Sequence, residues 1–303
     1  MPHVGPRLPF FARRPHPARA VAAGVGTIAA IVALAPFEPT ARADRAARAD
    51  RAATARRVER AELTGRGLRA RQLRINTRHG GIRVFLPAAT VAPSVVVLYV
   101  HGYGSSVDDT WRGHGLLRQF RASSRNAVFI SVEAPAGPGD YVRFRRLDRV
   151  LALVQRRVGA ALPRSVVAMG HSGAYRTLIR WLRYPHLRHV ILLDSLYCSP
   201  RYFARWFREN PDNRLTVIYR GPTPTRLSLR LARLLGNQAV MRRGVPRLSR
   251  GFPARDRAAR ALFIRSQYTH LAIVIAERVI PVVLRDRLRQ GAAARRAGPL
   301  ADS

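Results

Sequence analysis

The stretch "SVVAMGHSGAYRTLIRWL", residues 165–182, indicates a buried strand, a tight corner and a helix in immediate succession. The apolar run ends in Gly170-His171-Ser172-Gly173-Ala174, and apolar residues at helical spacing follow. A strand-to-helix corner with small residues around a serine can hold its hydroxyl exposed as a nucleophile. The competing interpretation is an ordinary serine N-cap, which is common at helix starts. We predict that Ser172 is a nucleophile if a base and an acid lie near it.

From residue 70 onward, short apolar runs alternate with helical patterns, and the last pattern predicts a helix that is interrupted at Pro281. Two of the runs flank a turn-rich "TRHGG" and predict a hairpin, and the others are apolar enough to be buried on both faces. The runs that predict strands lie within residues 71–76, 82–88, 94–104, 126–135, 164–173, 187–197, 214–221 and 259–266. Such alternation is typical of a doubly wound, mostly parallel sheet, which predicts a three-layer αβα fold.

Polar residues follow several of these predicted strands, where ligands bind in open α/β sheets. His101, Ser172, Asp194 and His270 each come at the carboxyl end of a different run. A serine nucleophile needs a general base, and the chain order serine, acid, histidine is one of the known orders of this catalytic set. His270, in "SQYTHLAIV", is therefore the predicted base, although a histidine at this place can also cap or pack against a helix start.

The predicted acid is Asp194, at the end of "VILLDSLY". It would orient the ring of His270 and stabilise the imidazolium. The stretch "TVIYRGPTPTR", which holds the next strand, contains no carboxylate, and this favours Asp194. A turn or N-cap role for Asp194 stays open, and the alternative acids are Asp108, Asp109 and Glu133.

The run His101-Gly102-Tyr103-Gly104 is a candidate oxyanion loop, because it follows the strand that precedes the first major helix. In acyl transfer the oxyanion accepts hydrogen bonds from backbone N–H groups of this loop and of the residue after the nucleophile. We assign these donors to Tyr103 and Gly173. Within the loop His101 is expected to brace the backbone, with Gly102 and Gly104 supporting the turn.

The sequence gives no sign of a metal site or a disulfide. Cys198 is the single cysteine and is expected to pack near a strand end. The spacings between His101, His171 and His270 do not match those of a metal-ligand pair. His171 is expected to point away from the nucleophile.

At these residues the chain resembles the α/β-hydrolase family. The resemblance covers about residues 70–290 and rests on "YVHGYGSS", "GHSGA", "LLDSLY" and "SQYTHLAIV". It implies an eight-stranded, mostly parallel sheet, a serine–acid–histidine triad and no cofactor. The chain departs from the family pattern at Ala174, where the elbow usually has glycine, and at Asp194, which comes one strand early. The short segment between residues 197 and 214 leaves no room for a large lid, so we expect an open site with at most the "YFARWF" helix over it.

The basic residues are unusual in kind and number. The formal net charge is +37, and all 54 basic residues are arginine, spread along the whole chain of 303 residues. Because no nucleic-acid-binding motif accompanies them, we interpret them as a composition bias and not as a nucleic-acid-binding face. The charge should still attract anionic surfaces or polymers at low salt.

The N-terminal 43 residues have the three parts of a secretory signal. A basic start and an apolar run over residues 20–35 precede Ala41-Arg42-Ala43, which fits a cleavage site. The alternative is an uncleaved inner-membrane anchor. Residues 44–69 are an arginine- and alanine-rich tether, disordered or helical, and residues 291–303 are a flexible tail.

These expectations converge on an exported serine hydrolase that cleaves an ester or amide of a small-molecule or acyl substrate through an acyl-enzyme on Ser172. The alternative is a catalytically inactive module of the same fold that binds anionic envelope polymers. Nucleic-acid binding has only composition behind it.

Overall fold

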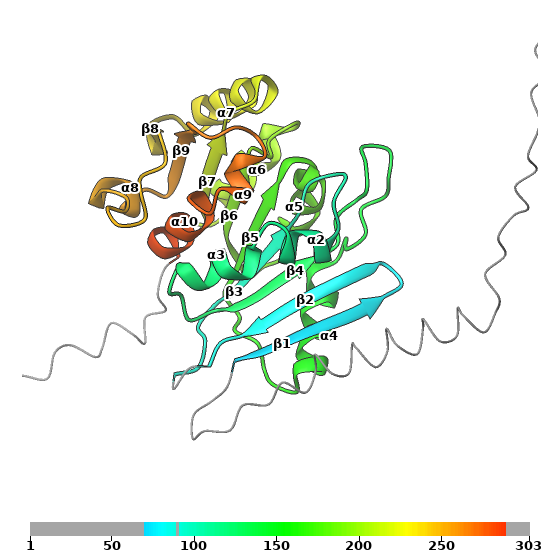
Figure 1. Ribbon diagram of the computed structural model, residues 1–303. Helices are drawn as coiled ribbons and strands as arrows, with labels where there is room; N and C mark the ends of the chain where they lie inside the picture. Colours follow the sequence, from blue (N-terminus) through cyan, green and yellow to red (C-terminus); the bar gives the residue numbers. More distant parts are fainter. Residues whose placement is uncertain (1–69, 89–90, 289–303) are drawn as a thin grey trace, which may run out of the picture. The chain divides into compact units, whose positions relative to one another are not determined.

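The computed structural model of the protein describes residues 70–88 and 91–288, all within one compact unit (Figure 1). The predicted signal peptide (1–43), tether (44–69) and tail (291–303) lie outside the described residues. No helix in the described ranges is long and apolar enough to cross a membrane.

The described strands form one mixed sheet in the order β1-β2-β4-β3-β5-β6-β7-β9-β8. The hairpin pairs β1 with β2 antiparallel, and β2 also pairs antiparallel with β4, whereas every other pairing is parallel. The strands are β1 (Arg71–Thr77), β2 (Gly80–Leu86), β3 (Val96–Val100), β4 (Val128–Val132), β5 (Val166–His171), β6 (Leu187–Leu193), β7 (Arg214–Tyr219), β8 (Ala239–Arg243) and β9 (Ala261–Arg265).

The doubly wound, mostly parallel sheet is therefore confirmed, but the expected eight strands are nine in the described chain. The additional strand, β8, lies at the sheet edge, and none of its residues is fully buried. An edge strand needs no continuous apolar run, because solvent covers part of it. In contrast, every residue of β3, β4, β5 and β7 is buried, which explains why their apolar runs are so clear in the sequence.

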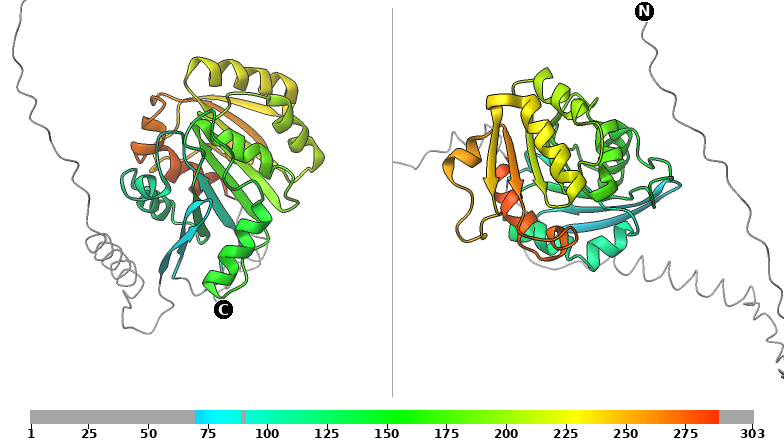
Figure 2. Two further views of the ribbon diagram at one scale, coloured as in Figure 1. Left: turned by 90° about the vertical axis from the view of Figure 1, so that its right-hand side faces the viewer. Right: turned by 90° about the horizontal axis from the view of Figure 1, so that it is seen from above.

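Helices cover both faces of the sheet and complete the predicted three layers (Figures 1 and 2). On one face α4, α5, α6 and α7 pack residues such as Val154, Leu178, Phe203 and Leu231 against it. The other face is covered by α2, α3, α9 and α10, with α3 beside α10. The helices are α2 (Val107–Arg112), α3 (Leu116–Ala122), α4 (Leu147–Val158), α5 (Tyr175–Trp181), α6 (Pro200–Glu209), α7 (Pro222–Leu235), α8 (Ala254–Ala258), α9 (Ala272–Ile275) and α10 (Val279–Arg287), with the short 3-10 turns η1 (Ser172–Ala174) and η2 (Gly236–Gln238).

The aromatic helix α6 belongs to these packed layers. Its residues Phe203, Trp206 and Phe207 are buried in the core on the α4–α7 face of the sheet, and the helix lies against α7. Three of its four aromatic side chains are thus directed into the protein core, whereas Tyr202 is exposed.

The final helix is interrupted, but not where the sequence predicts. The break falls between α9 and α10, where Glu277 has a left-handed backbone with φ 55°. Pro281 lies in the first turn of α10, where its missing N–H removes no helical hydrogen bond. The proline is therefore compatible with helix, and the interruption belongs to Glu277.

Candidate active site

The predicted nucleophile elbow is formed by the end of β5 and the turn η1. Ser172 has φ 52°, the left-handed region that a side chain occupies only at a cost. A Cβ on Gly173 would lie 2.3 Å from the ring of Tyr103, and one on Gly170 would lie 2.7 Å from the Cβ of Ala174. These two positions therefore require glycine, whereas Ala174 fits the fully buried position that it occupies.

The candidate oxyanion loop lies directly against this elbow. A Cβ built on Gly102 would be 2.9 Å from the Cβ of Ser172, and the ring of Tyr103 covers Gly173. The N–H of Gly104 donates to the carbonyl of Ala136 at 3.1 Å, which ties the loop to the segment after β4. Among the hydrogen bonds of the described residues, the N–H of Tyr103 has no acceptor. The structure thus brings the loop that contains Tyr103 into contact with the elbow that contains Gly173.

His101 lies against this loop from inside the protein. The ring is fully buried, and Nδ1 donates to the carbonyl of Gly102 at 2.7 Å. Its Nε2 lies 2.9 Å from Oε1 of Glu133 and 3.0 Å from the N–H of Ala134. Glu133, an alternative acid in the sequence, therefore pairs with His101.

Asp194 and His270 meet at the carboxyl end of the sheet. His270 Nδ1 lies 2.7 Å from Oδ2 of Asp194, whose side chain is fully buried at the end of β6. Oδ1 accepts from the N–H of Arg220 at 2.7 Å and of Gly221 at 3.2 Å. Burial would raise the pKa of Asp194, but the hydrogen bonds from His270, Arg220 and Gly221 hold it below its ordinary value.

The position of the acid follows from these contacts. Arg220 and Gly221 directly follow β7, the strand after which the resemblance would place the acid. This strand end supplies backbone donors to a carboxylate that arrives from β6. A buried carboxylate needs such donors to stay ionised. Asp194 therefore follows β6, but its carboxylate is held by backbone N–H groups that follow β7, the strand that has no acid of its own.

Ser172 does not bond directly to His270 in this state. The hydrogen bonds of the described residues include none between Ser172 Oγ and the ring of His270. The His270 side chain is 41% exposed, so it borders the opening of the site. Catalytic hydrogen bonds are often long or poorly aligned without substrate and tighten when it binds.

His171 has a contact that the sequence did not predict, because its ring lies against the predicted base. The ring centroids of His171 and His270 are 4.5 Å apart, and His171 Nε2 donates to the carbonyl of His270 at 3.0 Å. Burial lowers the pKa of His171 to about 3, and the neighbouring His270 adds to this. His171 is therefore a neutral support beneath the His270 loop. The residue between a glycine and the nucleophile varies freely in such elbows, so the sequence carried no signal for this contact.

Sequence reasoning also missed several polar side chains of the site. Ser195 Oγ donates to the carbonyl of Ser172 at 2.7 Å, which ties the loop after β6 to the elbow. The rings of Tyr175 and Tyr197 are tilted against each other with centroids 6.0 Å apart, and Tyr197 meets His270 edge to face at 6.4 Å. All three follow within a few residues of a predicted nucleophile or acid, which is the signal that could have found them.

The remaining candidate acids and ligands have other partners. Asp108 pairs with Arg74 at 2.7 Å and Arg83 at 2.6 Å. Asp109 accepts from Ser106 in the capping box of α2. Within residues 70–88 and 91–288 there is no group of three or more histidine, cysteine, aspartate or glutamate residues that could hold a metal ion. Cys198 is a free, half-buried thiol close to Tyr175.

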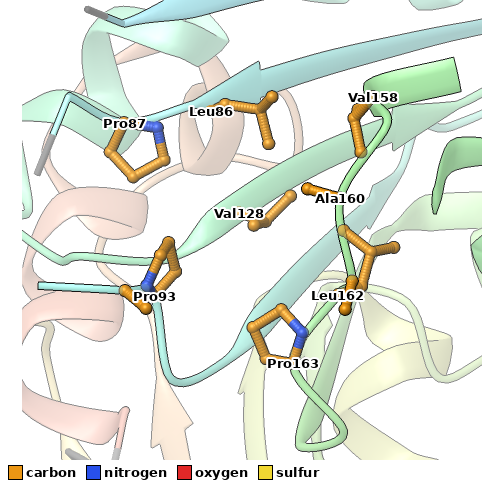
Figure 3. A pocket seen from close by; sticks show the side chains of 10 residues that line it. Leu86, Pro87, Pro93, Val128, Val158, Ala160, Leu162 and Pro163 are labelled. Carbon is orange, nitrogen blue, oxygen red and sulfur yellow. The ribbon is translucent and has the colours of Figure 1, made fainter. Parts of the chain in front are cut away.

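A hollow of about 320 Å³ lies at the other end of the sheet (Figure 3). It opens near the amino ends of β4 and β5 and contains no titratable side chain among its lining residues, which are Leu86, Pro87, Ala92, Pro93, Val128, Val158, Ala160, Ala161, Leu162 and Pro163. The hollow therefore offers no group for acid–base or nucleophilic chemistry.

Comparison with known proteins gives similarity at the level of structure. No protein-family model matches the chain, and no curated protein matches it. Solved structures that it resembles include the thermostable carboxylesterase EstE1 from a metagenomic library, with 16% identity, 79% of this chain and 98% of that chain covered, and a TM-score of 0.45. Another is the S-formylglutathione hydrolase FrmB of Staphylococcus aureus, with 14% identity, 74% of this chain and 98% of that chain covered, and a TM-score of 0.49. A third is carboxyl esterase 2 of the fungus Tuber melanosporum, with 13% identity, 76% of this chain and 90% of that chain covered, and a TM-score of 0.46.

The strand order, the strained serine elbow after β5 and the histidine after β9 define an α/β-hydrolase fold for this chain.

Proposed function

We propose that the protein is a serine hydrolase that cleaves an ester or amide bond through an acyl-enzyme on Ser172. The observation that supports this most is the 2.7 Å contact between His270 and the buried Asp194. This contact lies at the carboxyl ends of the strands, as does the strained Ser172 elbow. A buried carboxylate on the Nδ1 side of a histidine fixes the tautomer whose Nε2 can accept a proton. A purely structural ion pair would not need a strained serine beside it.

The proposed reaction begins with attack of Ser172 Oγ on the carbonyl carbon. His270 Nε2 takes the serine proton, and Asp194 stabilises the imidazolium through Nδ1. The N–H groups of Tyr103 and Gly173 donate to the oxygen that becomes negative. His270 then protonates the leaving group. In deacylation His270 takes a proton from the water molecule that attacks the acyl carbon, and it returns this proton to Ser172 Oγ as the acyl group leaves as a carboxylic acid.

The chemistry is tested with a fluorophosphonate probe, which reacts with activated serines. The wild-type protein should be labelled at one site, and the labelled peptide should contain Ser172. A panel of short and long acyl esters and peptide amides then identifies the leaving group and acyl length that the site accepts. A wild-type protein that is neither labelled nor active on any member of the panel contradicts the proposal.

The second candidate is a non-catalytic module that binds anionic envelope polymers, and the net charge of +37 favours it. Exposed arginines line the outer faces of α6 and α7, among them Arg201, Arg205, Arg226 and Arg230. This candidate requires binding that weakens steeply with salt and no labelling by the probe. Retention on a column of an anionic polysaccharide, measured across salt concentrations, separates the two candidates.

We also propose that the protein is exported, with residues 1–43 as its signal peptide. The basic start, the apolar run and Ala41-Arg42-Ala43 support this. N-terminal sequencing of the protein recovered from cell fractions tests it. A mature chain that begins at Asp44 supports cleavage, and an intact chain in the membrane fraction supports the anchor instead.

A further inference from the structure

The segment that follows β4 at the carboxyl end of the sheet has little packing of its own. It covers residues 135–141, Pro-Ala-Gly-Pro-Gly-Asp-Tyr, and four of these seven residues are exposed. At Gly137 and Gly139 a Cβ would meet no other atom within 4 Å. Glycine also leaves the backbone freer than other residues do. The conformation of this segment therefore depends on hydrogen bonds.

Arg176 supplies several of these hydrogen bonds. It lies in the first turn of α5, the helix that leaves the serine elbow. Its Nη1 donates to the carbonyls of Gly137 at 3.1 Å and Pro138 at 2.8 Å, and its Nη2 donates to the carbonyl of Asp140 at 2.6 Å. The carboxylate of Asp140 pairs with Arg143 instead, at 3.2 Å. The guanidinium of Arg176 is thus directed to the backbone of one short segment.

The same segment is connected to the candidate oxyanion loop. Asp140 Oδ2 accepts from the N–H of Ala136 at 2.8 Å, and its Oδ1 accepts from the N–H of Tyr141 at 2.8 Å. The carbonyl of Ala136 in turn accepts from the N–H of Gly104 at 3.1 Å. Arg176 therefore fixes the segment whose Ala136 carbonyl binds the oxyanion loop.

The peptide that carries the N–H of Tyr103 is restrained from two sides. Its own carbonyl, on Gly102, accepts from His101 Nδ1 at 2.7 Å. The next peptide is held by the bond to Ala136, and the hydroxyl of the Tyr103 ring lies 3.5 Å from Nη1 of Arg176. An oxyanion donor is effective only when it is aimed at the position where negative charge develops. These contacts fix the direction of the donor before substrate binds.

Resting on the function proposed above, we propose that Arg176 is a positioning residue for the oxyanion donor of Tyr103. It acts through residues 136–140, which fix the loop that carries the donor. A displacement of about 1 Å at a catalytic group can lower the rate by about 100-fold, even when its cause lies far from the chemistry. A loosened segment should therefore slow the steps in which the oxyanion forms and leave ground-state binding of the substrate nearly unchanged.

The test compares Arg176→Gln and Arg176→Lys with the matched control Arg180→Gln. Arg180 is exposed on the same helix, and its side chain makes no hydrogen bond to the described residues. Arg176→Gln should lower kcat for a p-nitrophenyl ester by about 10- to 50-fold, less than the loss of an oxyanion donor itself, with little change in KM. Lysine keeps the charge but not the planar fork, so Arg176→Lys should lie between Gln and wild type. Arg180→Gln should match the wild type.

Inhibition by a boronic acid distinguishes positioning from a general loss of structure. The tetrahedral boronate that forms on a nucleophilic serine resembles the transition state, and one of its oxygens occupies the oxyanion site. Arg176→Gln should weaken this inhibition by about the same factor as it lowers kcat. Each kcat is expressed per serine titrated by the fluorophosphonate, so that a partly unfolded sample does not imitate the effect.

The outcomes separate this inference from the proposed function. A wild type labelled at Ser172, with equal kcat and equal boronate inhibition for Arg176→Gln, overturns the role of Arg176 alone. A fall in kcat without a matching loss of boronate inhibition also overturns it. A wild type that is not labelled overturns the proposed function itself.

A second variant keeps the inference testable if Arg176→Gln does not fold. Asp140→Ala leaves Arg176 in place but removes the acceptor of the Ala136 N–H, so it loosens the same segment from within. It should lower kcat and weaken boronate inhibition together, with little change in KM. Wild-type values for both quantities in folded Asp140→Ala overturn the inference.

Discussion

The two ends of the parallel strands differ in what they expose. At the carboxyl ends, Ser172 and Asp194 both have left-handed backbone, and polar side chains bond to one another and to backbone N–H groups. At the amino ends lies a hollow of about 320 Å³ with an apolar lining. A hollow alone therefore does not locate the chemistry of this molecule. Strand direction does, because the loops that leave the carboxyl ends lead into helix N-termini and present backbone N–H groups there.

The largest effect should come from Ser172→Ala. Loss of the proposed nucleophile should lower kcat on an ester by about 10⁴- to 10⁶-fold, the range found when a catalytic serine is removed from a serine hydrolase. It should also abolish labelling by the fluorophosphonate. Thermal unfolding, followed by circular dichroism, checks that the variant folds. Labelling of the variant at the wild-type rate would mean that another residue is the nucleophile. It would also contradict the view that the carboxyl ends of the strands carry the chemistry.

A slightly smaller effect is expected for Asp194→Asn. The amide cannot fix the His270 tautomer that accepts the serine proton, which should lower kcat by about 10³- to 10⁴-fold. The matched control is Asp108→Asn, at an alternative acid that pairs with Arg74 and Arg83 at the same end of the sheet. Its kcat should stay close to wild type. If the Asp108 variant loses activity and the Asp194 variant keeps it, the acid has been assigned wrongly.

His171→Phe tests the support beneath the His270 loop. The variant keeps a ring against His270 but loses the donor to its carbonyl, so we expect a fall in kcat of about 3- to 10-fold, as for one lost hydrogen bond. His171→Gln retains a donor and should be less impaired. Steady-state kinetics on one ester measure kcat for both variants. If the Gln variant is as slow as the Phe variant, the hydrogen bond from His171 to the carbonyl of His270 does not contribute to activity.

The same residue predicts a pH dependence of stability. Its pKa is lowered to about 3 in the folded protein, so the unfolded chain binds a proton here that the folded chain excludes. The free energy of unfolding should therefore fall as the pH drops from about 6.5 toward 3. His171→Phe cannot titrate, so its unfolding free energy should fall less over this range. Denaturant titrations at a series of pH values measure the difference, and parallel curves for both proteins would contradict it.

The smallest effect on activity should come from the other end of the sheet. Leu162→Ala enlarges the apolar hollow and should cost about 1 kcal/mol of unfolding free energy, because the side chain is only partly buried. Its kcat and KM should match wild type. A marked loss of activity in a folded Leu162 variant would mean that the hollow communicates with the site.

Much of this fold can be predicted from the sequence, because the strands that are fully buried are also the segments with continuous apolar runs. The fully buried strands β3, β4, β5 and β7 show continuous apolar runs, whereas the edge strand β8 and the short helices α2, α3 and α8 have too few residues to show a period. Chain order placed Ser172, Asp194 and His270 at one end of the sheet. The contacts of His171, Ser195 and Tyr197 depend instead on side-chain directions, which neighbours from distant segments determine.

The parallel order of the sheet has a consequence for how the protein acquires its activity. The site draws on the ends of β3, β5, β6 and β9, so its groups are separated by up to the whole interval from His101 to His270. Pairings between segments so distant in sequence form slowly, because the entropy cost of closing the loop arises before the contacts that offset it are formed. Reactivity with a covalent serine probe should therefore return only when the last of these pairings is complete, and it can serve as a clock for the end of refolding.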